Sequence, residues 1–193
     1  DSRAPVRKGP FASEGEASHK GKIIYKNKVA VYPPSDWQPA LAERSAELPE
    51  ARLFLEFVYG YAGLQNASHN LFYLSSGEIV YYNAAVGIVY SPPPVHKQRF
   101  FIGHNDDIRS ISVCGAEIQH KGIRYPPRTL VATGQVSSKE GGPYICIWDS
   151  RAESLSGEAE VARIQFAVES RGICVLAFSP CGGMLVSVEM DNP

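Results

Sequence analysis

The chain has 193 residues, 44% of them hydrophobic and 20% charged, with a formal net charge of −1 at pH 7. This length and balance are typical of a globular protein with a buried core, organised as one large or two small domains. The longest apolar run, residues 84–90, is far too short to cross a bilayer, which argues against a membrane-spanning chain. The chain starts at Asp1 without a leader, so we expect it to be part of a longer protein.

The charge is distributed unevenly along the chain. Residues 1–30 contain seven Lys or Arg and three acids, whereas the remaining residues contain 12 basic and 17 acidic side chains. Residues 1–20 have almost no large apolar side chains, so we expect a flexible basic arm. Such an arm favours a polyanionic partner, although a solvated leader without a partner is the alternative. The candidate contact residues are Arg7, Lys8, Lys20, Lys22, Lys26 and Lys28.

A second region, residues 21–69, combines short strands with a dense apolar segment. Residues 22–32 predict two short strands around the polar turn 26–28, and the stretch 35–49 fits a helical turn or a loop. Residues 53–63 fit either an extended chain or a helical stripe, and their glycines and aromatic residues favour the extended form. In that form one face carries Leu53, Leu55, Phe57, Tyr59 and Tyr61, and we expect this face to be buried against a neighbouring sheet.

Residues 70–102 predict a four-stranded antiparallel meander. The expected strands are 70–74, 78–83, 86–90 and 97–102, separated by a Ser-Ser-Gly turn and by three consecutive prolines. Four strands with short links form one propeller blade.

The next region, residues 103–170, opens with Gly103-His104 and contains Trp148-Asp149. Strands are expected near 107–113, 129–134, 143–148 and 161–168. A Gly-His opening and a Trp-Asp close separated by about 40–45 residues are typical of a WD-repeat blade. Residues 171–193 begin a third blade. Because a propeller needs about four to eight blades, we expect continuation beyond Pro193 or a second chain at that edge.

No catalytic, phosphate-binding or metal-binding motif is recognisable in the sequence, so we predict a non-enzymatic protein without a cofactor. His104 is best explained as part of a buried hydrogen-bond relay with Thr133 and Trp148 that joins strands. The Asp that usually completes this relay is missing, since Glu140 is the only acid between Thr133 and Trp148. The relay is therefore expected to be incomplete or altered.

In their order, these motifs resemble the echinoderm microtubule-associated protein-like family. The segment 53–63 resembles that family's HELP motif, and the resemblance continues through 70–81, 98–108, 131–135 and 145–150. It implies an all-β fold, the N-terminal part of a tandem atypical WD-repeat propeller, with the HELP segment packed between two propellers. Ala62 departs from the family, in which a basic residue is common at this position.

The resemblance implies a microtubule-associated scaffold that binds tubulin in the cytoplasmic cytoskeleton or in a ciliary or axonemal structure. The four scattered cysteines, without a paired motif, agree with a reducing compartment. The alternative is a general WD-repeat adaptor for signalling or ubiquitin transfer. The acidic folded body argues against nucleic acid as a partner, and no membrane partner is expected.

Overall fold

The computed structural model describes residues 23–24, 30–32, 53–61, 63, 69–139, 141–155 and 158–190. The chain divides into two compact units, Asp1–Leu53 and Phe54–Pro193. In the first unit, β1 (Ile23–Ile24) and β2 (Ala30–Val31) form an antiparallel pair at the place where two short strands are expected.

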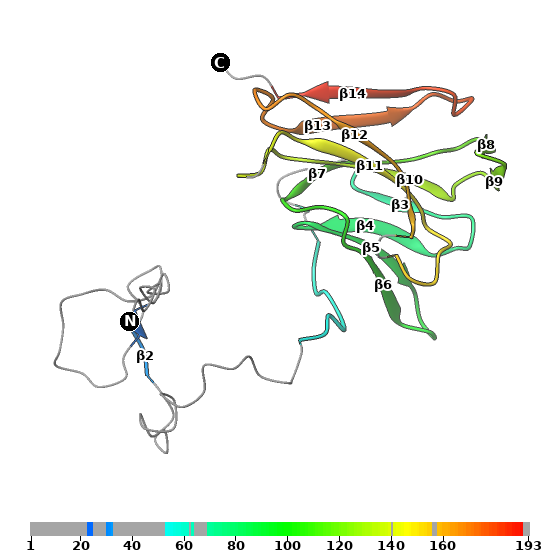
Figure 1. Cartoon of the computed structure of the whole chain (residues 1–193). Helices are drawn as coiled ribbons and strands as arrows, with labels where there is room; N and C mark the ends of the chain where they lie inside the picture. Colours follow the sequence, from blue (N-terminus) through cyan, green and yellow to red (C-terminus); the bar gives the residue numbers. More distant parts are fainter. Residues whose placement is uncertain are drawn as a thin grey trace, which may run out of the picture. The chain divides into compact units, whose positions relative to one another are not determined.

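The second unit begins with a four-stranded antiparallel sheet (Figure 1). Its strands follow one another in sequence order and are β3 (Leu71–Tyr73), β4 (Ile79–Asn83), β5 (Val86–Ser91) and β6 (Lys97–Phe101). The turn before β4 contains Gly77 at a φ of 82°, a conformation that glycine adopts without steric cost. Each of the four strands expected over residues 70–102 is therefore present.

A second four-stranded sheet has the order β12-β11-β10-β7. Its strands are β7 (Ile108–Val113), β10 (Leu130–Gln135), β11 (Tyr144–Asp149) and β12 (Glu160–Gln165). A small hairpin, β8 (Ile118–His120) and β9 (Ile123–Tyr125), is inserted between β7 and β10. The hairpin was not expected from the sequence, because its strands are only three residues long and include polar residues.

The last two strands, β13 (Ile173–Phe178) and β14 (Leu185–Glu189), pair with each other. β13 packs against β7 and β10, and β4 packs against β7, so the three sheets succeed one another in sequence order (Figure 1). The structure is all-β, as expected, and the described residues include no helix. Accordingly, no membrane-spanning helix is found among them.

The core lies between the first two sheets. The rings of Phe101 on β6 and Trp148 on β11 are stacked, with centroids 4.7 Å apart and planes at 6°. Both side chains are fully buried, and Gly87 lies beside them, where an added Cβ would be 3.1 Å from the Trp148 ring. This stack therefore joins the first sheet to the second through aromatic contact without an intervening side chain.

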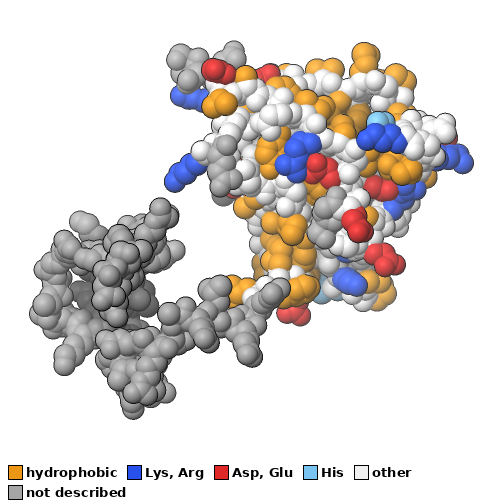
Figure 2. All heavy atoms as spheres, viewed as in Figure 1, with side chains coloured by type: hydrophobic (Ala, Val, Ile, Leu, Met, Phe, Trp, Pro, Cys, Tyr) orange, Lys and Arg blue, Asp and Glu red, His pale blue; other side chains and the backbone are white. Residues whose placement is uncertain are grey.

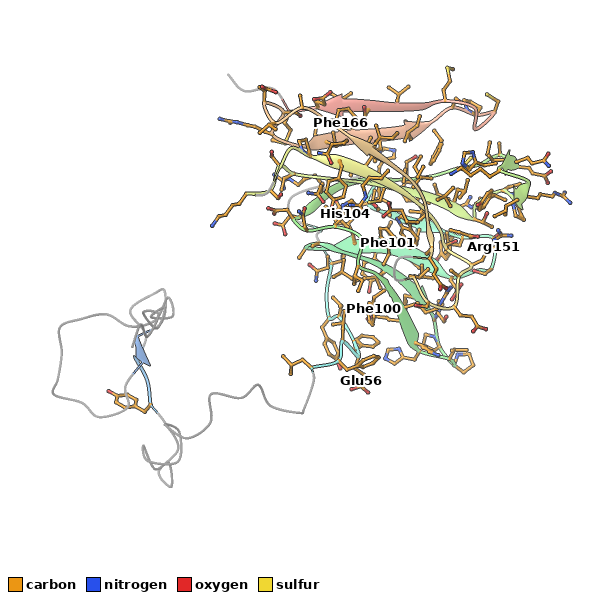
Figure 3. The ribbon with its side chains drawn as sticks, in the orientation of Figure 1. Glu56, Phe100, Phe101, His104, Arg151 and Phe166 are labelled. Atoms are coloured by element: carbon orange, nitrogen blue, oxygen red, sulfur yellow. The ribbon has the colours of Figure 1, made fainter. Side chains whose placement is uncertain are left out.

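We predict that Phe101→Ala lowers the free energy of unfolding by about 3–5 kcal/mol, because it leaves a cavity against the Trp148 ring. The matched control is Phe100→Ala, which changes the adjacent, half-buried phenylalanine of β6 (Figure 3). Urea unfolding of both variants tests the prediction. Equal losses in the two variants would contradict a special role for the stack.

Candidate functional site

The three predicted relay residues lie together in the second sheet. His104 precedes β7, whereas Thr133 and Trp148 lie on the neighbouring strands β10 and β11. The Trp148 indole Nε1–H donates to Thr133 Oγ1 at 3.1 Å, and Thr133 Oγ1 lies 2.7 Å from His104 Nε2. All three side chains are buried, with His104 near Phe101 on the inner side of the sheet (Figure 3).

Gln135, at the end of β10, is the hydrogen-bond partner of the other ring nitrogen of His104. Its Oε1 lies 2.9 Å from His104 Nδ1, and its Nε2 donates to Asn105 Oδ1 at 2.7 Å and to the Val136 carbonyl at 3.0 Å. Since Oε1 can only accept, His104 Nδ1 carries the proton and donates. The sequence offered a signal only in the β10 alternation, which places residues 133 and 135 on one face.

The protonation of His104 gives the relay a direction. Burial lowers the pKa of His104 to about 4, so the imidazole is neutral at pH 7. Nε2 therefore has a free lone pair and accepts from the Thr133 hydroxyl, which itself accepts from Trp148. Each polar atom of the relay has at least one partner of the correct kind, and a neutral glutamine suits a neutral histidine.

A second layer covers the His104 ring. Tyr144 stacks on it at 5.3 Å with planes at 8°, and the Arg163 guanidinium lies 4.5 Å above the Tyr144 ring. Arg163 also donates to the Gly103 carbonyl at 3.1 Å and pairs with Glu160 at 2.6 Å. Gly103 and His104, which lie between β6 and β7, are thus held by side chains from β11 and β12.

The polar groups of the relay are engaged within the fold. Both nitrogens of His104 are engaged, so the ring has no lone pair available to act as a base. Burial raises the pKa of the Cys146 thiol to about 12, which disfavours the nucleophilic thiolate at pH 7. Across the described part of the chain, no group of three His, Cys, Asp or Glu side chains could hold a metal ion.

The segment expected to be buried is instead exposed. Leu53, Leu55, Tyr59 and Tyr61 are all exposed, and Phe54 is 90% exposed. Only Phe57 and Val58 are half-buried, because the segment touches the first sheet along one side and no described element covers its other side. It forms no helix and pairs with no described strand, so the helical interpretation is wrong.

Gln98 on β6 holds this segment in place. Its Oε1 accepts from the Val58 N–H at 2.7 Å, and its Nε2 donates to the Val58 carbonyl at 3.0 Å and to the Tyr81 hydroxyl at 2.9 Å. Phe57 adds contact with the rings of Tyr90 and His96. A buried side-chain amide thus replaces the backbone pairing that a strand would make. Sequence reasoning did not single out Gln98.

The predicted cationic contacts, Arg7, Lys8, Lys20, Lys22, Lys26 and Lys28, all lie outside the described residues.

We predict that Thr133→Val lowers the free energy of unfolding by about 2–4 kcal/mol, because it leaves His104 Nε2 and the Trp148 N–H buried without a partner. Thr133→Ser keeps the hydroxyl and should cost only about 1 kcal/mol for the lost methyl group. Chemical denaturation of both variants provides the comparison. A valine variant as stable as the serine variant would show that the relay contributes little.

We also predict that Gln98→Leu raises the amide exchange rate of Val58 about tenfold, because the segment loses both bonds that hold its backbone. Gln119→Leu, at an exposed position of β8, is the control. Hydrogen–deuterium exchange over residues 54–61 is the measurement. Unchanged exchange in the Gln98 variant would mean that other contacts hold the segment.

The chain is similar in sequence to a known motif family and to several named proteins. Residues 48–88 match the HELP motif family. The chain is 36% identical to echinoderm microtubule-associated protein-like 2 of Rattus norvegicus over 76% of its length and 21% of that protein. It is 37% identical to echinoderm microtubule-associated protein-like 1 of Mus musculus, over 85% of this chain and 19% of that protein.

A third relative has a similar sequence identity to the chain. The 77 kDa echinoderm microtubule-associated protein of Lytechinus variegatus is 36% identical over 85% of this chain and 23% of its own length. The chain therefore spans about a fifth of the length of these relatives. With its HELP motif followed by antiparallel sheets, the chain belongs to the echinoderm microtubule-associated protein-like family.

Proposed function

We propose that this chain is part of a non-enzymatic scaffold that associates with microtubules by binding tubulin through a WD-repeat propeller. The supporting observation is the identity of 36–37% to proteins named as microtubule-associated, over 76–85% of the chain. The similarity extends well beyond the HELP motif and includes much of the sheet region. It therefore supports a shared architecture rather than a shared short motif.

The geometry agrees with a scaffold. The sheets are joined by buried aromatic and hydrogen-bonded contacts, which support a stable platform for surface binding. The buried polar cluster around His104 has its hydrogen-bonding groups engaged within the fold. Binding would therefore use the exposed surface and not an internal cleft.

The proposed location is the cytoplasmic cytoskeleton, including ciliary or axonemal microtubules. We further propose that the basic residues before Val29 strengthen binding to an acidic lattice surface. The residues after Ala30 carry 12 basic and 17 acidic side chains, so the cations of the first region are the part of the chain with complementary charge.

We predict that the chain co-pellets with assembled microtubules and that the bound fraction falls as salt is raised, because added ions screen exposed charges. The variants Lys20→Gln/Lys22→Gln and Lys26→Gln/Lys28→Gln should each bind more weakly than the wild-type chain. The matched control, Lys97→Gln/Lys139→Gln, removes the same charge from exposed positions of the sheet region.

The role of the basic residues and the association with microtubules can each be refuted separately. Salt-resistant pelleting with no effect of the arm variants would move the contact to the sheet surface and refute the role of the arm. Absence of pelleting at every salt concentration would contradict microtubule association. A binding partner that is retained without tubulin would then favour the general adaptor.

A further inference from the structure

The inserted hairpin β8–β9 combines an anchored base with an exposed tip. At the base, Tyr125 is buried and Ile118 packs beside it in a small core with Cys114 and Leu130. Beyond this base, Gln119, His120, Lys121, Gly122, Ile123 and Arg124 are exposed. Among the described strands, β8 and β9 pair only with each other, so the outer edge of each lacks a neighbouring strand.

The turn of the hairpin fixes the position of Lys121. His120 pairs with Ile123, which leaves Lys121 and Gly122 as a two-residue loop. Their φ angles of 49° and 79° are those of a type I′ turn, the geometry that matches the twist of a tight hairpin. Lys121 therefore lies at the tip of a short, well-defined turn and not on a long loop.

Cations gather around this hairpin. Residues 115–128 contain Lys121, Arg124 and Arg128 and a single carboxylate, Glu117, which gives a formal charge of +2. Figure 2 shows Lys and Arg side chains at the margin that β8 and β9 occupy in Figure 1. The rest of the chain after Ala30 has nine basic and sixteen acidic side chains, so the hairpin is a positive site on an acidic body.

Two arginines are held at the site by the fold. The Arg124 guanidinium is 73% exposed and pairs with Glu117 at 2.5 Å. Arg151, which follows β11, lies 5.4 Å from the centre of the Tyr125 ring and donates to the Arg124 carbonyl at 3.4 Å (Figure 3). Arg151, which also pairs with Asp149 at 2.7 Å, is thus oriented on the hairpin before any partner binds, which lowers the entropic cost of binding.

The chemistry of the surface favours an acidic polypeptide over a nucleic acid. Open strand edges can hydrogen-bond to a peptide backbone, which a nucleic acid lacks. Ile123 is 52% exposed between the cations and suits a partner that also carries apolar side chains.

We propose that the β8–β9 hairpin, with Lys121, Arg124 and Arg151, is a docking surface for an extended acidic polypeptide segment. The segment aligns along the outer edge of β8, because the Arg124 carbonyl of β9 already accepts from Arg151. Its carboxylates meet the cations, and an apolar side chain contacts Ile123. This surface is separate from the basic residues before Val29, and the inference does not depend on microtubule association.

The test uses the whole chain and a fluorescein-labelled Glu-rich peptide with interspersed Val and Gly, followed by fluorescence anisotropy. Lys121→Asn/Arg124→Gln should weaken binding about fivefold, since two exposed charge contacts are lost. Asparagine tolerates the positive φ at position 121, so the turn is kept. Lys97→Asn/Lys139→Asn removes the same charge elsewhere and should leave the affinity unchanged.

Three results would overturn the proposal. Equal weakening in the two double variants would mean attraction to overall charge only. No measurable binding of the peptide by the wild-type chain would remove the site. Tighter binding of a single-stranded oligonucleotide than of the peptide, lost in the same hairpin variant, would assign the surface to nucleic acid.

Discussion

The structure of the sheet region depends on the buried contacts around Trp148. Its indole N–H is held by Thr133, its ring stacks on Phe101 of the preceding sheet, and Thr133 in turn holds His104 between the sheets. A polar relay is stable in this dry setting only because each donor faces an acceptor. One tryptophan thus couples pairing within a sheet to packing between sheets.

The same contacts explain why glycine precedes His104. A Cβ at Gly103 would lie 2.4 Å from the Phe101 ring, and the Gly103 carbonyl accepts from Tyr144 at 3.0 Å and from Arg163 at 3.1 Å. A side chain here would displace the Phe101 ring from its stack on Trp148. The Gly-His pair therefore combines a steric requirement with a hydrogen-bonding one.

Much of the fold could be predicted because strand periodicity is a local signal. The strands of both large sheets lie at the expected positions, since most of them are short apolar or alternating runs bounded by turn residues. Gln135 and Gln98 could not be found in this way, because their roles depend on partners 31 and 40 residues away. A polar residue in a strand gives no sign of whether it faces solvent or a buried partner.

The exposed segment 53–61 marks a second limit of sequence reasoning. A dense apolar pattern indicates that a surface needs covering, but it does not say which element provides the cover. In this chain the segment meets the first sheet through Phe57 and Val58 and exposes its other residues. The hairpin β8–β9 was missed for the opposite reason: its polar tip hides the strand pattern.

A neutral His104, protonated on Nδ1, directs the relay from Trp148 to Gln135. A long-range ¹H–¹⁵N correlation spectrum of the histidine rings, recorded between neutral and mildly acidic pH, tests this directly. We predict an Nδ1–H tautomer of His104 that stays neutral well below pH 6.5, its ordinary pKa. An Nε2–H tautomer, or a ring that protonates near pH 6.5, would contradict it.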